Sequence, residues 1–120
     1  MLYPKNLRKI EGVLHTLGLL GYSVSMRQMV YAVELAHEDL SLLTNVSKGL
    51  YQRVAEEMGN TNNTAVERNL RALRDRQWAK GDRERLREMA MYQMKMKPST
   101  GEFIDIIRYY MEANDLLPDG

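Results

Sequence analysis

Apolar residues recur at steps of three and four along most of this chain, which is the spacing of amphipathic α-helices. Leu7, Ile10 and Leu14 begin this pattern and predict a first helix over residues 6–19, ended by Gly18. Alternation of apolar and polar residues, which would indicate β-strands, never extends beyond a few positions. The pattern therefore predicts an all-α fold.

Five more helices are expected from the same spacing and from local start and stop signals. Gly59 and Gly81 end the third and fourth helices, because glycine is common just after a helix. Ser99 and Glu102 form an S-x-x-E capping box at the start of the last helix. The expected segments are one capped by Ser25, then about 42–58, 64–79 and 83–92, and one starting at Ser99. Together they predict a compact bundle of about six helices in one domain spanning 1–120.

The composition excludes several classes of protein. The chain has 120 residues, enough for one domain with its own core, and no cysteine, so disulfides, cysteine zinc sites and thiol catalysis are ruled out. The first residues carry charge and no apolar run follows them, so we expect no signal peptide. The chain also has no apolar stretch of about eighteen residues, and we expect a cytoplasmic protein without membrane contact. The only histidines, His15 and His37, have no acid cluster at metal-ligand spacing. Without a phosphate-binding glycine loop or a nucleophile motif either, we expect no enzyme, metal or cofactor.

Positive charge is concentrated in one segment, although the net charge is only +1. Residues 1–63 contain six Lys or Arg and six Asp or Glu, and residues 88–120 contain three against six. Residues 64–87 contain eight against four, a balance of +4, and include the predicted fourth helix. A basic segment of this kind indicates a polyanion such as DNA. The alternative is an ordinary solvated helix with intrahelical ion pairs such as Arg71–Asp75.

The third and fourth helices are separated by a short turn, as in a helix-turn-helix. That motif needs a small residue where the helices cross, a turn residue that accepts positive φ, and a buried aliphatic residue early in the second helix. Ala55, Gly59 and Val66 match these requirements, in a motif over about 46–79. Val66 comes one position late, so we expect a turn that is one residue longer. Many antiparallel helix pairs would also match this pattern.

The fourth helix has a defined expected start and a charged outer face. Thr64 and Glu67 match a capping box. The first two turns of a recognition helix contact base edges, where Arg68 can pair with guanine and Glu67 can accept from cytosine. Arg71 and Arg74, further along the helix, are placed for contacts to phosphates.

Four stretches of the chain resemble a known family in order and nearly in spacing. They are LHTLG at 14–18, VSKGLYQRVAEEM at 46–58, VERNLRALRDRQWAKG at 66–81 and KPSTGEFI at 97–104. The chain is similar to the C-terminal DNA-binding domain of the master sporulation response regulator of endospore-forming bacteria. The resemblance implies a six-helix domain whose third and fourth helices form the helix-turn-helix. It also implies binding of double-stranded promoter DNA, often as tandem dimers, and regulation of transcription.

The resemblance assigns roles to individual positions. Thr64, Glu67 and Arg68 match family residues that face bases, and Arg71 matches one that faces the DNA backbone. Lys97 lies in a loop that approaches the DNA in the family.

Two departures from the family pattern affect what we expect. The turn GNTNNT at 59–64 is one residue longer, which makes Asn62 or Asn63 a further candidate for contacts to DNA. Ala65 and Asn69 replace an arginine and a small apolar residue, so the DNA sequence recognised is expected to differ. Nothing in the chain resembles the family's N-terminal receiver domain, which leaves an excised effector domain or a stand-alone regulator as interpretations.

The C-terminal third suggests contacts to proteins. Five methionines lie at positions 89, 91, 94, 96 and 111, and are interpreted mainly as core residues, with an adaptable binding surface as the alternative. Tyr109, Tyr110 and the acidic tail are candidates for contact with an RNA polymerase sigma subunit or with a second copy in a homodimer. The alternative function is a helical protein-interaction module, such as an antagonist that dimerises with a full-length response regulator.

Overall fold

A computed structural model describes residues 2–117, and every regular element in that range is helical. In chain order these are α1 (Pro4–Thr16), α2 (Val24–Glu38), the 3₁₀ turn η1 (Leu40–Thr44), the π turn η2 (Val46–Leu50), α3 (Tyr51–Met58), α4 (Asn63–Lys80), α5 (Arg83–Ala90) and α6 (Thr100–Ala113). The predicted all-α fold of about six helices is confirmed. The end of the acidic tail, residues 118–120, lies outside the described range.

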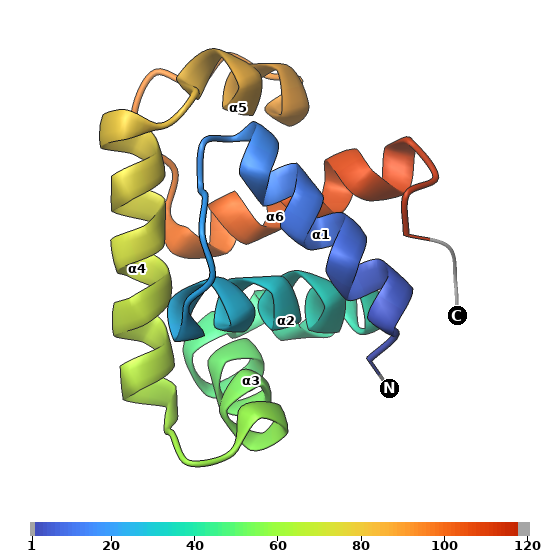
Figure 1. Ribbon diagram of the computed structural model, residues 1–120, viewed down its shortest axis with the longest axis vertical. Coiled ribbons are helices and arrows are strands. Elements are labelled where there is room, and N and C mark those ends of the chain that lie inside the picture. Colours follow the sequence, from blue (N-terminus) through green and yellow to red (C-terminus); the bar gives the residue numbers. More distant parts are fainter. Residues whose placement is uncertain (1, 118–120) are drawn as a thin grey trace.

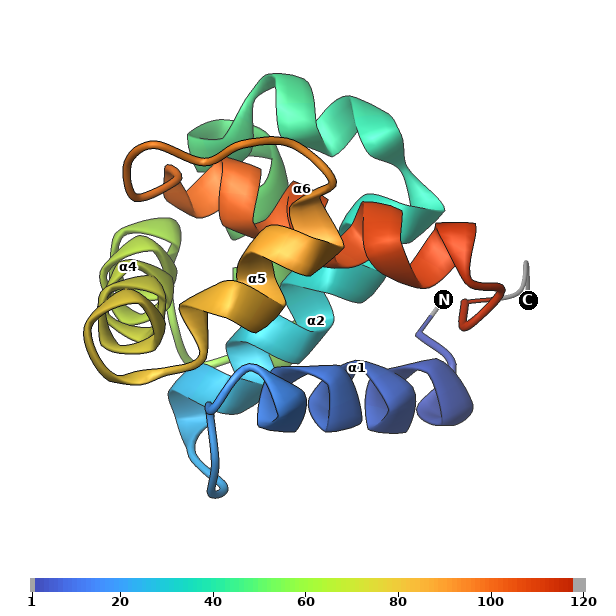
Figure 2. The same ribbon diagram turned by 90° about the horizontal axis from the view of Figure 1, so that it is seen from above.

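The helices are arranged around α2. Figure 1 shows α4 along one side of the molecule, with α3 near one of its ends and α5 near the other. Viewed from above, α2 lies between α1 and α6, and α4 is seen end-on at the edge (Figure 2). No helix in the described part of the chain is both long and apolar enough to cross a membrane.

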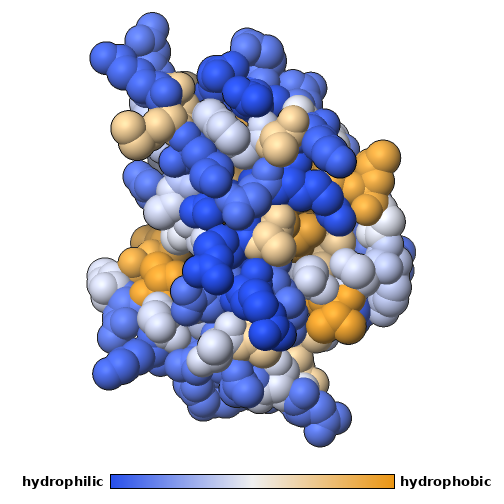
Figure 3. All heavy atoms as spheres, turned by 90° about the vertical axis from the view of Figure 1, so that its left-hand side faces the viewer, coloured by the Kyte–Doolittle hydropathy of each residue, from blue (hydrophilic) through white to orange (hydrophobic). Residues whose placement is uncertain are grey.

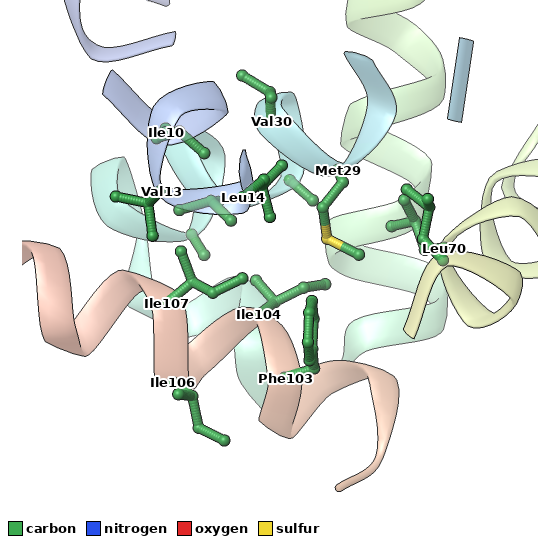
Figure 4. Close-up of a cluster of buried hydrophobic side chains, with 14 of the residues drawn as sticks. Ile10, Val13, Leu14, Met29, Val30, Leu70, Phe103, Ile104, Ile106 and Ile107 are labelled. Atoms are coloured by element: carbon green, nitrogen blue, oxygen red, sulfur yellow. The ribbon is translucent and has the colours of Figure 1, made fainter. Parts of the chain in front are cut away.

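The core is formed where α1, α2, α4 and α6 meet. Figure 4 shows Leu14 of α1, Met29 of α2, Leu70 of α4 and Phe103 of α6 converging, and all four side chains are fully buried. Burying apolar area of this kind is the main favourable term in folding. Because α4 contributes to this core along its whole inner face, its outer face is held in a defined orientation.

Polar contacts also join the helices. Glu34 of α2 is fully buried and accepts hydrogen bonds from the side chain of Asn6 and from the backbone N–H of Tyr3, which fastens the start of α1 to α2. Burial raises the pKa of Glu34, because removal from water disfavours the charged carboxylate. Three residues further along α2, Nδ1 of His37 lies 2.8 Å from Glu112 of α6.

The ends of the helices follow local capping signals, with one correction. Gly59 and Gly81 follow α3 and α4 as predicted, and Ser99 and Glu102 form the predicted capping box of α6. The cap of α2 is Ser23, whose hydroxyl oxygen accepts from the backbone N–H of Met26, so the prediction of Ser25 is wrong. The difference arises because Ser23 has the extended backbone of a cap.

The predicted continuous third helix over 42–58 is also wrong. Residue Asn45 interrupts it with φ −147° and ψ 78°, and its side chain accepts from the backbone N–H of Lys48. The chain therefore turns through η1 and η2 before the eight-residue α3. Asparagine bonds to nearby backbone in this way at the cost of helix continuity.

The methionines are divided between core and surface. Met89, Met94 and Met111 are buried, as the core interpretation predicts. Met91 and Met96, which lie between α5 and α6, are each 75% exposed. The core interpretation therefore holds for three of the five positions.

Candidate nucleic-acid interface

A tight corner joins α3 to α4. Gly59 has φ 73° and its backbone N–H bonds to the carbonyl of Ala55, and Asn60 also has positive φ. Ala55 is buried at 5% exposure and Val66 is fully buried on the other side of the corner. The three positions expected for a helix-turn-helix therefore have the predicted burial and backbone geometry, and four residues, 59–62, form the turn.

The start of α4 differs from the prediction. Asn62 is the N-cap, with an extended backbone and a side-chain Oδ1 that accepts from the backbone N–H of Ala65 at 2.9 Å. Thr64 therefore lies inside the first turn, and the predicted capping box of Thr64 and Glu67 is wrong. Thr64 is exposed and Asn63 is half-buried, with their side-chain oxygens 3.5 Å apart.

The inner face of α4 is fastened by polar contacts as well as by its aliphatic residues. The side chain of Asn69 donates to Gln28 of α2 at 2.9 Å. Nε2 of the buried Gln77 donates to the carbonyls of Leu17 and Asp82. Asn69 stood out in the sequence only as a departure from the family pattern, since its partner is 41 residues away. These contacts fix both the position and the rotation of α4.

The outer face of the first half of α4 is mostly hydrophilic. Figure 3 views the molecule from the side along which α4 lies, and its hydrophobic patches there are small and separated. Arg68 is exposed, and within residues 2–117 its side chain makes no hydrogen bond or ion pair. Arg71 pairs with Glu67 at 3.3 Å, one turn earlier, instead of with Asp75 as the solvated-helix interpretation expected. Of these side chains, Arg68 is the one most available to a ligand.

The second half of the helix carries a cluster that we call the flank cluster, made of Arg74, Asp75, Lys97 and Pro98. Nε and Nη2 of Arg74 donate to Oδ1 of Asp75 at 3.1 and 2.9 Å, and Nη1 donates to the carbonyl of Pro98 at 3.3 Å. Nζ of Lys97 donates to the same Oδ1 at 2.7 Å. The hydrogen bond from Lys97, together with Arg74, lowers the pKa of Asp75. Arg74 is only 14% exposed, whereas Lys97 is 40% exposed.

A groove of about 420 Å³ runs beside these residues, between α4, η2 and the start of α6. Arg71 and Arg74 line one wall, and Ser47 and Thr100 lie on the other sides. Gly101 and Val46, which both line the groove, lie close together, because a Cβ on Gly101 would lie 3.0 Å from the side chain of Val46. Glu67 and Tyr51 also line the groove, so two arginines, one carboxylate and small polar residues surround a surface depression beside the predicted recognition helix.

Comparison with known families agrees with this geometry. A family model described as sporulation initiation factor Spo0A C terminal matches residues 10–111. The chain belongs to this family. This match confirms the resemblance that the sequence indicated. The Spo0A C-terminal family is a family of DNA-binding regulatory domains of sporulation and not of enzymes. The matched range extends from α1 to α6 and includes the whole corner between α3 and α4.

Proposed function

We propose that this Spo0A C-terminal family member binds double-stranded DNA sequence-specifically through α4, and regulates transcription from the promoters that it binds. The observation that carries the proposal is the available face at the start of α4, where Thr64 and Arg68 are exposed while Val66 and Leu70 seat the helix. Recognition helices contact bases with side chains of this part of the helix. In this proposal α3, the turn and α4 act as the helix-turn-helix of a single effector domain.

The side chains divide between bases and backbone. Arg68 has the fork geometry to bond O6 and N7 of guanine. Oε1 of Glu67 is paired with Arg71 at 3.3 Å. A carboxylate has further acceptor positions, so Glu67 can accept from a cytosine amino group while this ion pair stays formed. Arg71 lies at the groove, where it is placed for a phosphate, and Asn63 and Thr64 supply shorter polar contacts near the helix start.

The contributions of the flank cluster differ from one another. Lys97 is exposed enough to meet a phosphate directly. Arg74 uses its guanidinium for Asp75 and Pro98, so its proposed contribution to phosphate binding is mainly through the positive charge that it adds to the groove.

The proposal also includes contact with other proteins. Large hydrophobic side chains remain exposed between α5 and α6 and on α6, at Met91, Tyr92, Met96 and Tyr109. These positions support contact with an RNA polymerase sigma subunit, or with a second copy in a homodimer on tandem sites. A cytoplasmic location follows from the proposed function.

Selection from a randomised duplex pool tests the proposal most directly. We expect enrichment of one short sequence, and fluorescence anisotropy on that sequence should show affinity that falls steeply as salt rises, since phosphate contacts release counterions. A scrambled duplex of equal length is the control and should bind much more weakly. No enrichment at any salt concentration, with the protein folded, would contradict the proposal and favour the protein-interaction module instead.

A further inference from the structure

The loop that carries Lys97 has few attachments to the rest of the molecule. Between the end of α5 at Ala90 and the cap of α6 at Ser99 there is no regular helix, and Met91 and Met96 are strongly exposed. Met94 and Pro98 are buried, and the hydrogen bonds that join the later part of the loop to α4 are those of Lys97 and Pro98 in the flank cluster. The exposed side chain of Lys97 therefore depends on α4 for its position.

Asp75 is the centre of that attachment. Its Oδ1 accepts from both Arg74 and Lys97, while Arg74 in addition holds the carbonyl of Pro98. A free lysine side chain has four rotatable bonds and loses entropy when it is confined to one contact. The carboxylate uses one of the three donors of the ammonium, so the other donors remain for a second oxygen.

We propose that Asp75 is a positioning residue of the DNA interface, which holds Lys97 beside α4 so that its ammonium is already in place for a backbone phosphate. The inference rests on the proposed function, since it concerns how the same interface is organised. In this proposal an acidic residue at the edge of the DNA-binding surface favours the binding of DNA. Charge alone gives the opposite expectation, because a carboxylate repels phosphate.

A double-mutant cycle separates positioning from repulsion. Lys97→Met removes the ammonium and keeps the stem, and Asp75→Asn removes the charge and keeps the shape. We expect Lys97→Met to weaken binding to the selected duplex by about three- to tenfold in the native background and by less than about twofold in Asp75→Asn. The salt dependence gives a second readout: Lys97→Met should lower its slope by about one counterion only when Asp75 is present.

The general effect of removing a negative charge is controlled with Glu11→Gln. Glu11 lies on α1, which packs mainly on α2, and the substitution makes the same change of net charge at a distance from α4. In the Glu11→Gln background the cost of Lys97→Met should equal that in the native protein. Thermal denaturation of each variant verifies that it is folded before binding is compared.

The possible outcomes are distinct. A cost of Lys97→Met that is equal in both backgrounds, or absent in both, overturns the positioning role, and a larger cost in Asp75→Asn shows that Asp75 competes with the phosphate instead. These results leave the proposed function intact, because the native protein still binds the selected duplex. If the proposed function is wrong, the native protein will fail to bind any duplex in the selection experiment, before any variant is compared.

Discussion

The first two turns of α4 leave Thr64 and Arg68 exposed, whereas in the last two turns Arg74 and Gln77 bond to other segments of the chain. The side chain of Arg68 makes no hydrogen bond or ion pair within residues 2–117, while Arg74 bonds to Asp75 and Pro98, and Gln77 bonds to two backbone carbonyls. The start of the helix therefore offers side chains to a ligand, whereas its second half adds polar contacts that help to hold the helix on the domain. A count of arginines does not reveal this difference, since it depends on which of them already have partners.

The anchored end should give the largest effect on stability. A Cβ at Gly81 would lie 2.6 Å from the carbonyl oxygens of Gln77 and Leu17, which are backbone atoms with little freedom to move. We expect Gly81→Ala to lower the free energy of unfolding by about 2–3 kcal/mol through this steric conflict. Urea denaturation followed by circular dichroism measures the change.

Gly12→Ala is the matched control for that substitution. Gly12 lies inside α1 with no atom near the position of a new Cβ, so alanine there should stabilise the protein by about 0.5–1 kcal/mol. Equal changes in the free energy of unfolding would show that the close approach of Gly81 to Leu17, just after α1, does not anchor α4.

The available end should affect binding instead of stability. We expect Arg68→Ala to relax specificity at one base pair and to cost about 1–3 kcal/mol at the selected site. Arg71→Ala should weaken binding to all duplexes alike and reduce the salt slope by about one. Anisotropy on the selected duplex and on its single-base variants measures both. If neither substitution changes binding to any duplex, α4 is not the recognition helix.

The start of α4 gives a smaller effect that distinguishes two neighbouring residues. Asn62→Ala removes the side-chain cap and should lower the free energy of unfolding by about 1 kcal/mol. Thr64→Ala lies inside the first turn and should change it by less than about 0.5 kcal/mol. The reverse order in thermal denaturation would restore Thr64 as the cap that the sequence alone predicted.

The flank cluster should give the smallest effect, visible through pH. The hydrogen bond from Lys97, aided by Arg74, lowers the pKa of Asp75 in the folded state, so its contribution to stability is present above the ordinary carboxyl pKa. That contribution is lost as the pH falls through the lowered value, and it should be at most about 1 kcal/mol because the pair is half-exposed. The stability difference between native protein and Asp75→Asn, measured by urea denaturation, should shrink toward acidic pH. A difference that stays constant would indicate that the cluster is not formed in solution.

Local signals in the sequence were sufficient for much of the fold. The three- and four-residue spacing located the helices, Gly59 and Gly81 marked the ends of α3 and α4, and Ser99 marked the start of α6. These features depend on interactions within about one turn of the chain, so neighbouring residues determine them. The spacing was less informative at Asn45, where a side chain bonds its own backbone and breaks a pattern that apolar residues alone would continue.

The available face of α4 could be predicted only in part. The sequence indicated that Arg68 and Arg71 lie on the outer face, and both are exposed. It did not indicate that Arg74 is mostly buried, because the residue that it contacts, Pro98, is 24 positions away. A charged side chain has many possible partners in the sequence, and it pairs with those that lie close to it in space. These distances are set only when the chain folds.

By itself, therefore, the sequence determined most of the helices, several of their ends, the concentration of basic charge in residues 64–87 and the family to which the chain belongs. Only the tertiary structure decided which charged residues are free and which are paired. It brought Lys97 to Asp75 and Asn69 to Gln28, over separations of 22 and 41 residues. The physical reason is that helix formation is settled by contacts within a few residues, whereas the pairing of side chains between helices is settled by how those helices pack.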